Sequence, residues 1–473
     1  MRGLRTYIII LSLTCGLVSS CKFGPNYQRS EPAIPEQYRF DPNPGDSLIN
    51  MLWWEIFNDE ELKTLIKIGL EENRDIRIAA ARIQEAVAVY GFTKADIYPR
   101  LDITAQGQTG NFLQGQGAPT DGDRIDVFLV APTLSWEIDF WGKFRRANEA
   151  ARADILATEQ AHRVIAISLI SEIASTYFLL LDYQNRLEIA RRTLDSRVKS
   201  LEIIQARFDE GTIPEIDLNQ AQIQKEIAAQ AVPQFERLLG KTENVMSVLI
   251  GRNPQAIQTG LGLYEQDNFT AVPAGIPSEL LNRRPDVLQA EYELMAQNAQ
   301  IGIAVAQRFP SISLTGTVGL ISPDLSDFTD IWSVGGNLTG PIFNFGKNKR
   351  RVEIERIRTE QALAFYENTI LNAFADVEDA LIEIQTYNDE FSAAQRRRAA
   401  ASNARELSNQ RYDGGVTSYL EVLDSERSLF DAELAASETL QEKLTAYINL
   451  YKALGGGWIS EEEMQQAEST DEE

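Results

Sequence analysis

The stretch "DVFLVAPTLSWEIDF", residues 126–140, alternates apolar and polar side chains over most of its length. A period of two indicates a β-strand with one apolar and one polar face. The stretch "SISLTGTVGL" at 311–320 alternates in the same way, and "RLDITAQ" at 100–106 and "IWSVGGNLTG" at 331–340 do so more weakly. The apolar positions of the two clearer stretches are Phe128, Val130, Leu134, Trp136, Ile138, Phe140, Ile312, Leu314, Val318 and Leu320. The sequence therefore predicts four strands.

Two interpretations fit this alternation. A soluble, half-buried sheet shows the same pattern and is the more common case. Strands of roughly ten residues with a polar inward face also fit an outer-membrane barrel. Four strands cannot close, because the smallest such barrels use about eight, and lipid does not satisfy an open sheet edge. If the strands span a membrane, several chains must share one barrel, and three chains would supply about twelve strands.

The strands lie at equivalent positions in two halves of the chain that have similar sequences. Residues 73–103, "NRDIRIAAARIQEAVAVYGFTKADIYPRLDI", resemble residues 283–314, with Asp75 and Asp286 separated by an offset of 211. Later in each half the offset is 204, as between Arg207 and Arg411. The difference places a longer insertion in the first half, most simply "GNFLQGQGAPTDGDR" at 110–124. Constant offsets indicate one internal duplication.

Each half also contains a long stretch without Gly or Pro, namely 144–210 and 347–413. As a helix, each would be on the order of 100 Å long. Apolar residues recur three and four apart, as in "LISEIASTYFLLL" at 169–181, so the helices are expected to pack side by side. Helices of this length favour a coiled-coil or helical-barrel architecture.

The chain of 473 residues carries 45 Lys and Arg against 69 Asp and Glu, a net charge of −24, which argues against nucleic acid as a partner. Residues 1–20 are typical of a signal peptide that ends in "VSSC". This ending resembles a bacterial lipobox, which would make Cys21 the lipidated first residue. The alternative is an ordinary secretory signal with an incidental cysteine. After residue 20 no apolar run of about 20 residues appears, which argues against a transmembrane helix in the mature chain.

Several stretches resemble the TolC-like outer-membrane efflux factors, in particular the lipoprotein branch that pairs with resistance-nodulation-division pumps. The matching stretches are "CKFGPNY" (21–27), "WWEIFNDEEL" (53–62), "IPSELLNRRPDVLQAEYEL" (276–294), "FPSISLTGTVG" (309–319), "YLEVLDSERSLF" (419–430) and "ALGGGW" (453–458). The resemblance implies a mainly α fold with membrane β: a homotrimer whose outer-membrane β-barrel, four strands per chain, continues as a long periplasmic α-helical barrel. It also implies a periplasmic adaptor protein, an inner-membrane pump and outer-membrane lipid as partners.

The expected organisation follows the duplication. The parts are a signal peptide (1–20), a lipidated extended segment (21–56), a first repeat (57–252), a linker (253–276), a second repeat (277–457) and an acidic tail (458–473). Each repeat is expected to hold two strands, near 99–140 and 310–345, and a long hairpin with its tip near 209–217 or 412–421.

The hairpin tips carry the candidate functional residues. Gly211, Gly414 and Gly415 are expected to make the turns. "SYLE" has the form of a capping box, with Ser418 as N-cap and Glu421 at the third helical position. "TIPE" repeats this form at Thr212 and Glu215.

Just beyond the second turn, Leu420, Asp424 and Arg427 are spaced to share one helix face. Asp424 and Arg427 fit an ordinary surface ion pair, and that interpretation is favoured on spacing alone. The resemblance implies that these positions line a constriction at the periplasmic tip. We then expect Leu420 to form an apolar plug, Asp424 and Glu421 an acidic ring, and Arg427 ion pairs that hold the closed state. Asp217 is the expected contribution of the first hairpin.

Residues for catalysis or metal binding do not assemble in the sequence. His162 is the single histidine, and Cys21 is the one cysteine left after the signal. These residues supply neither a nucleophile–base pair nor metal-ligand spacing, so the sequence predicts no enzyme, no metal and no cofactor beyond the covalent lipid. The favoured function is a passive exit duct for small molecules in a tripartite efflux system. The alternatives are the outlet of a type I protein-secretion system and a lipid-anchored coiled-coil spacer.

Overall fold

The computed structural model describes residues 22–30, 32, 34–40, 58–110, 125–266 and 277–456. The predicted signal peptide, the predicted lipidation at Cys21 and the acidic tail from 458 lie outside the described residues.

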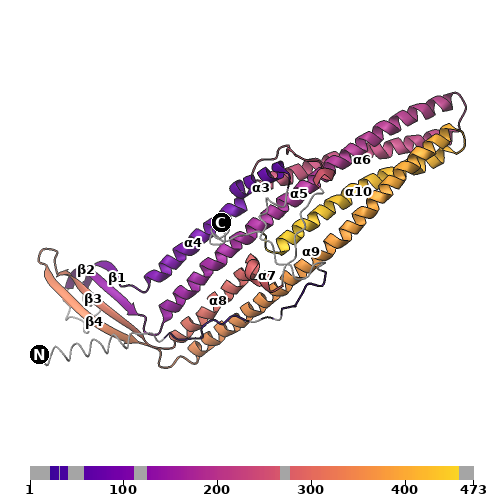
Figure 1. Cartoon of the computed structure of the whole chain (residues 1–473). Coiled ribbons are helices and arrows are strands. Elements are labelled where there is room, and N and C mark those ends of the chain that lie inside the picture. The colour runs from indigo at the N-terminus through magenta and orange to yellow at the C-terminus, as the bar shows by residue number, and fades with distance from the viewer. Residues whose placement is uncertain are drawn as a thin grey trace, which may run out of the picture. The chain divides into compact units, whose positions relative to one another are not determined.

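The described chain is mainly helical and contains one antiparallel sheet of four strands (Figure 1). In chain order the elements are α3 (Glu60–Glu72), α4 (Arg74–Ala95), β1 (Arg100–Gly110), β2 (Ile125–Ile138), α5 (Lys143–Asp209), α6 (Glu215–Leu249), the 3₁₀ turn η1 (Leu263–Gln266), α7 (Pro277–Arg283), α8 (Pro285–Ala306), β3 (Ser311–Ser322), β4 (Thr329–Thr339), α9 (Lys347–Asp413) and α10 (Tyr419–Ala453). The four strands fall in the four stretches that the alternation predicted.

The two halves have matching element lengths. Helices α4 and α8 each have 22 residues, α5 and α9 each have 67, and α6 and α10 each have 35. The breaker-free stretches thus form unbroken helices, and the predicted duplication is confirmed.

Contacts divide the chain into two compact units that do not follow the repeats. The first unit combines residues 1–32, 81–159 and 289–367 and includes the sheet. The second combines residues 33–80, 160–288 and 368–473 and includes both hairpin tips. Each unit draws on both repeats, because equivalent segments of the two halves lie together.

In the first unit, the sheet order is β1-β2-β3-β4, so β1 and β4 are its edges. The register pairs Val130 with Leu320 and Trp136 with Leu314, so the apolar positions of β2 and β3 share one face. On the other face Thr133 pairs with Thr317, and their hydroxyl oxygens are 3.3 Å apart. The apolar face extends over the edge strands through residues that are well exposed in the single chain. These residues are Leu101 (70% exposed), Ile103 (72%), Trp332 (79%), Val334 (81%) and Leu338 (68%).

A segment at the N-terminus, residues 22–30, which we call the N-terminal strap, also lies in the first unit. The side chain of Arg146 in α5 is fully buried and binds this strap. It donates hydrogen bonds to the carbonyl oxygens of Phe23 (3.0 Å) and Gly24 (2.9 Å) and to Oδ1 of Asn26 (3.0 Å). The ring of Phe23 lies 4.8 Å from that of Phe309, centroid to centroid. The residues just after Cys21 are therefore fixed to the helices by a buried charge and an aromatic contact.

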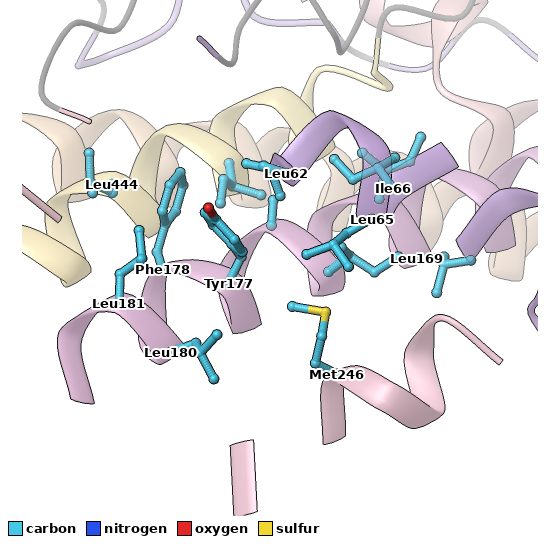
Figure 2. Packing of buried hydrophobic residues seen from close by; sticks show 14 of the residues in the cluster. Leu62, Leu65, Ile66, Leu169, Tyr177, Phe178, Leu180, Leu181, Met246 and Leu444 are labelled. Carbon is cyan, nitrogen blue, oxygen red and sulfur yellow. The ribbon is translucent and has the colours of Figure 1, made fainter. Parts of the chain in front are cut away.

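In the second unit, the main hydrophobic core gathers side chains of α3, α5, α6 and α10 (Figure 2). Tyr177 and Phe178 of α5 are fully buried beside Leu62 of α3 and Leu444 of α10. The described helices include one window of 18 residues, in α5, that is apolar enough to cross a membrane, and 61% of it is buried. The core contacts account for this apolar window without a membrane.

A buried arginine joins three helix ends in the second unit. Arg284, between α7 and α8, is 7% exposed. Its guanidinium pairs with Asp286 (2.6 Å) and with Asp376 of α9 (2.8 Å). It also donates to the carbonyl oxygen of Ala453, the last residue of α10, at 3.0 Å. Arg284, the second arginine of "NRRPDV", therefore connects the start of the second repeat with its end.

Candidate functional site

The two hairpin tips of the second unit have the same backbone turn. In the first, Gly211 N donates to the Phe208 carbonyl (2.8 Å) and Thr212 N to the Arg207 carbonyl (3.0 Å). In the second, Gly415 N donates to the Tyr412 carbonyl and Val416 N to the Arg411 carbonyl, both at 2.9 Å. Each turn is a Schellman motif with a left-handed glycine, at φ +71° for Gly211 and +70° for Gly415.

Gly414 lies in the turn as predicted, but it is not the left-handed residue of the turn. Among the described glycines only some have a positive φ, and Gly414 is not one of them. The equivalent position in the first hairpin is Glu210, which carries a full side chain. Because the turn needs one left-handed residue, only Gly211 and Gly415 are required by the backbone.

The predicted capping boxes are not formed. Ser418 occupies the N-cap position of α10, but its side chain makes no capping hydrogen bond. The Glu421 carboxylate accepts instead from the hydroxyl of Thr417 and pairs with Nε of Arg411 at 3.3 Å. In the first hairpin the N-cap is Pro214, so the capping prediction for Thr212 and Glu215 is wrong.

Thr212 instead closes the preceding helix. Its hydroxyl donates to the Arg207 carbonyl at 2.7 Å, which is the same oxygen that accepts from its own backbone N–H. The proline at 214 cannot donate a backbone hydrogen bond, so the first turn of α6 has one fewer group to satisfy.

A small hydrophobic core lies directly behind the tips. It contains Ile204 of α5, Ala221 of α6, and Tyr419, Val422 and Leu423 of α10. The hydroxyl of Tyr419 is buried close to the carboxylates of Glu426 and Asp217, and burial is the main reason that its pKa is raised. The two hairpins are therefore packed against each other at their ends.

Leu420, Asp424 and Arg427 lie on the opposite, exposed face of α10. Leu420 is 60% exposed, which is high for a leucine in a packed hairpin. Asp424 and Arg427 form an ion pair within the helix, and both side chains are largely exposed. The predicted common face is thus present, and in the single chain the predicted surface ion pair is formed as well.

The sequence reasoning overlooked Ile216. It occupies the position in the first hairpin that Leu420 occupies in the second, 204 residues earlier. Ile216 is 59% exposed, nearly the same as Leu420. Asp217 is likewise the equivalent of Glu421. Applying the repeat offset to every candidate residue would have identified Ile216, and each tip presents an exposed apolar side chain beside a carboxylate.

Cations and aromatic rings connect the two turns. The guanidinium of Arg207 lies 5.1 Å from the ring centroid of Tyr412 and 4.0 Å from Oδ1 of Asp413, both near the end of α9. The rings of Tyr412 and Tyr419 are 5.4 Å apart. The tyrosine pair lies within the second hairpin, so separating the hairpins would break only the two contacts of Arg207, each of which is weak by itself.

Within the described ranges, no group of three or more His, Cys, Asp and Glu side chains is arranged to hold a metal ion. His162 lies inside α5, where burial lowers the pKa of its imidazole and neighbouring Arg163 lowers it further. The position and the lowered pKa of His162 are those of a histidine packed within a helix.

Known proteins are similar to this chain over nearly its whole length. Residues 65–252 and 276–456 each match the family described as outer membrane efflux protein. The chain is 35% identical to the cation efflux system protein CusC of Escherichia coli K12, over 96% of this chain and 99% of that protein. It is 36% identical to the solvent efflux pump outer membrane protein SrpC of Pseudomonas putida, over 93% and 96%.

Solved structures also have a similar fold over nearly the whole chain. A crystal structure of CusC covers 92% of this chain and 100% of its own, with a TM-score of 0.82 and 35% identity. The open-state outer membrane channel MtrE of Neisseria gonorrhoeae covers 92% and 98%, with a TM-score of 0.83 and 29% identity.

Proposed function

The chain belongs to the outer membrane efflux protein family, and on this premise we propose that it forms a homotrimeric exit duct that is gated at its hairpin tips. Membership confirms the predicted family, fold class and location: the protein is an outer-membrane channel of efflux systems that extends into the periplasm. The proposal adds the assembly, the gate, the partners and the cargo.

The sheet is the observation that carries the assembly. One face of its four strands is apolar and exposed, the other is polar, and β1 and β4 are edges. In lipid, the edges require partners, which a chain with four strands cannot supply to itself. Three copies would pair β1 of one chain with β4 of the next and place the polar face around an aqueous lumen.

The gate is argued from the tips. Threefold symmetry would repeat Leu420, Asp424 and Ile216 around one axis, which would produce apolar rings beside carboxylate rings. Apolar constrictions close pores by excluding water, and charged rings select among ions. Opening would separate the hairpins and break the contact of Arg207 with Tyr412.

Single-channel conductance in planar bilayers tests the gate. Leu420→Ala and Asp424→Ala are each expected to raise a low wild-type conductance. Leu371→Ala is the matched control for the first, because Leu371 is 65% exposed on α9, far along the chain from the turn. Asp195→Ala is the control for the second, since Asp195 forms an exposed helical pair with Lys199.

The outcomes separate the hypotheses. An open wild type that neither tip change affects would keep the channel and remove the gate. Absence of conductance in all variants of a folded protein would favour the lipid-anchored spacer.

The partners are an inner-membrane pump and a periplasmic adaptor that contacts the tips. Val416, at the end of the second turn, is 72% exposed and gives such a contact an apolar centre. The cargo is small molecules, by analogy with relatives named for cation and solvent efflux. The protein acts without catalysis, and selectivity belongs to the pump.

Cargo is tested by deleting the gene and measuring tolerance to metal cations, organic solvents and several antibiotics. Loss of tolerance to small molecules supports the efflux duct, whereas a defect confined to a secreted protein would favour a type I secretion outlet.

The proposed lipid is tested separately by mass spectrometry of the mature N-terminus. A diacylglyceryl and acyl mass on Cys21 is expected, and an unmodified mature protein would indicate an ordinary secretory signal. Cys21→Ala serves as the control.

A further inference from the structure

We propose that the second unit contains an anion-binding site, unconnected with the tip surface, in a pocket between α5, α9 and α10 that is centred on Arg197 and Arg405. The pocket has a volume of about 380 Å³. Its walls include Arg192, Arg197 and Lys199 of α5, Arg405 of α9, and Glu426 and Phe430 of α10.

Arg197 is the central residue of this pocket. It is 3% exposed, and only its Nη1 atom has a partner, the carbonyl oxygen of Gln224 at 2.7 Å. Among the described residues, its Nε and Nη2 atoms find no hydrogen-bond acceptor although both are buried. Phe430 lies against the guanidinium, 5.2 Å from centroid to Cζ, and supplies no acceptor. Buried guanidinium groups are normally paired, so two unused donors on one arginine call for a ligand.

Arg405 adds a second cation to the same pocket. Its Nε atom is also buried and has no acceptor within the described part of the chain. The other two cations of the pocket are already paired. Arg192 binds Glu433 at 2.9 Å, and Lys199 binds Asp195 at 2.6 Å. Among the described cations of the pocket, buried donors without an acceptor therefore belong to Arg197 and Arg405, which lie on different helices.

Glu426 is the one carboxylate of the pocket that is left to neutralise them. In the described ranges it forms no ion pair within 4.0 Å of either arginine, and burial raises the pKa of its carboxyl group. Asp431 also acts on Arg197 with its negative charge, so the two guanidinium groups are in excess when Glu426 is protonated. Guanidinium groups bind halides and small oxyanions through charge-assisted hydrogen bonds.

The ligand is accordingly a small anion of single negative charge. A water molecule occupies about 30 Å³ of liquid, so the pocket has room for such an anion with several waters. By accepting from Arg197 and Arg405 together, the anion would connect α5 with α9 below the tip turns.

Bromide is the probe, because its anomalous scattering identifies it in crystals of the full-length protein. A peak within hydrogen-bonding distance of Arg197 and Arg405 is expected at millimolar bromide. Arg405→Met is expected to abolish the peak. Lys199→Met is the matched control, since it removes a cation from the same wall whose charge is already paired, and the peak should remain.

A melting curve gives a second measurement. Replacing gluconate with bromide at equal ionic strength should raise the melting temperature of the wild type by roughly 2 °C and leave Arg405→Met unchanged. Glu426→Gln should reach half-saturation at a bromide concentration on the order of tenfold lower, because a repelling charge is removed.

The proposal is overturned if wild-type crystals show only water between the two arginines, or if the bromide peak survives in Arg405→Met. If Arg405→Met does not fold, the presence or absence of the bromide peak in wild-type and Lys199→Met crystals still tests the proposal. Because the probe is read in crystals, none of these results depends on channel activity or gating.

Discussion

Gly24 of the N-terminal strap lies with its backbone directly against Gly302 of α8: a Cβ atom on Gly24 would fall 2.5 Å from the Cα of Gly302. Gly24 also has a φ of +92°, which disfavours any other residue. On its other side Gly302 faces Arg146, whose Cγ would lie 2.7 Å from an added Cβ. The two glycines thus allow the strap to reach the buried arginine that holds it.

Gly24→Ala is therefore expected to release the strap. The clash and the left-handed backbone together should cost about 1–3 kcal/mol, which the strap loses by detaching locally. Hydrogen exchange at residues 22–30 should increase. Gly240→Ala is the control, because a Cβ there meets no atom within 4 Å and its φ is not positive. In the interior of α6 this control should stabilise the protein by about 0.5–1 kcal/mol. Unchanged exchange in Gly24→Ala would contradict the tight contact.

Arg284→Met should destabilise the second unit by about 1–3 kcal/mol, because it leaves the buried carbonyl oxygens of Ala373 and Ala453 without their donor. Asp376 would lose its 2.8 Å ion pair, and the carbonyl of Ala453 would lose its hydrogen bond. Thermal unfolding in detergent measures the loss. Arg252→Met is the control, since its pair with Glu72 at 3.0 Å is exposed and should matter little. Equal melting temperatures for the two variants would refute the structural role of Arg284.

The two glycines of the second tip should respond differently to the same change. Gly415→Ala forces a side chain into a φ of +70° and is expected to cost about 1–2 kcal/mol. Gly414→Ala should be close to neutral, because Glu210 occupies the equivalent position of the first hairpin. Hydrogen exchange over residues 410–420 reports the local stability of each variant. If Gly414→Ala proved the more damaging, the shared turn geometry would not explain why glycine stands there.

Glu426 should make stability depend on pH. Burial raises the pKa of its carboxyl group above the ordinary value of 4.5, although Arg197 and Arg405 act in the opposite direction. The folded protein therefore holds this proton more tightly than the unfolded chain does. The contribution of protonated Glu426 to the free energy of unfolding is therefore fully present below pH 4.5, and it is lost as the pH rises through the raised pKa.

Glu426→Gln should remove this dependence, so its advantage in melting temperature over the wild type is expected to grow between about pH 4.5 and neutrality. A constant difference between the two proteins across this range would show that Glu426 does not titrate in it.

Local patterns made most of the fold predictable. Alternation located β1 to β4, and the absence of Gly and Pro located α5 and α9 to within one residue at each end. These features depend on neighbours in the sequence, where propensity and periodicity act directly. The exposed face of Leu420 was predictable for the same reason, because helical spacing alone determines which side chains share a face.

The errors at the tips arose from competing local interactions. Thr212 has the sequence context of an N-cap, but its hydroxyl serves the end of α5 because Pro214 takes the cap position of α6. Gly414 looked necessary because it precedes Gly415, and only the backbone angles separate their roles.

The buried arginines were not predictable at all. In the sequence, Arg146, Arg197 and Arg284 resemble the many charged residues of solvated helix faces. Each is nevertheless at most 7% exposed. Arg146 has one local partner, Glu149, but the contacts that bury it are to residues far away in the chain, such as Phe23, so no local period signals its burial. The partner of Arg197 is the carbonyl oxygen of Gln224 on the next helix.

The equal lengths of the helices in the two halves also bear on how this protein can evolve. A deletion of seven residues from α5 alone would shorten it by about 10 Å and leave α9 unmatched. Changes of helix length are therefore expected in pairs, unlike the insertion at 110–124, which lies between strands of the first half alone. Single residues do differ between the halves, as Ile216 and Leu420 or Glu210 and Gly414 show. Helix length is thus the feature that the two halves still share. Chimeras that exchange a whole hairpin with a relative should fold, whereas chimeras that exchange part of a hairpin should not.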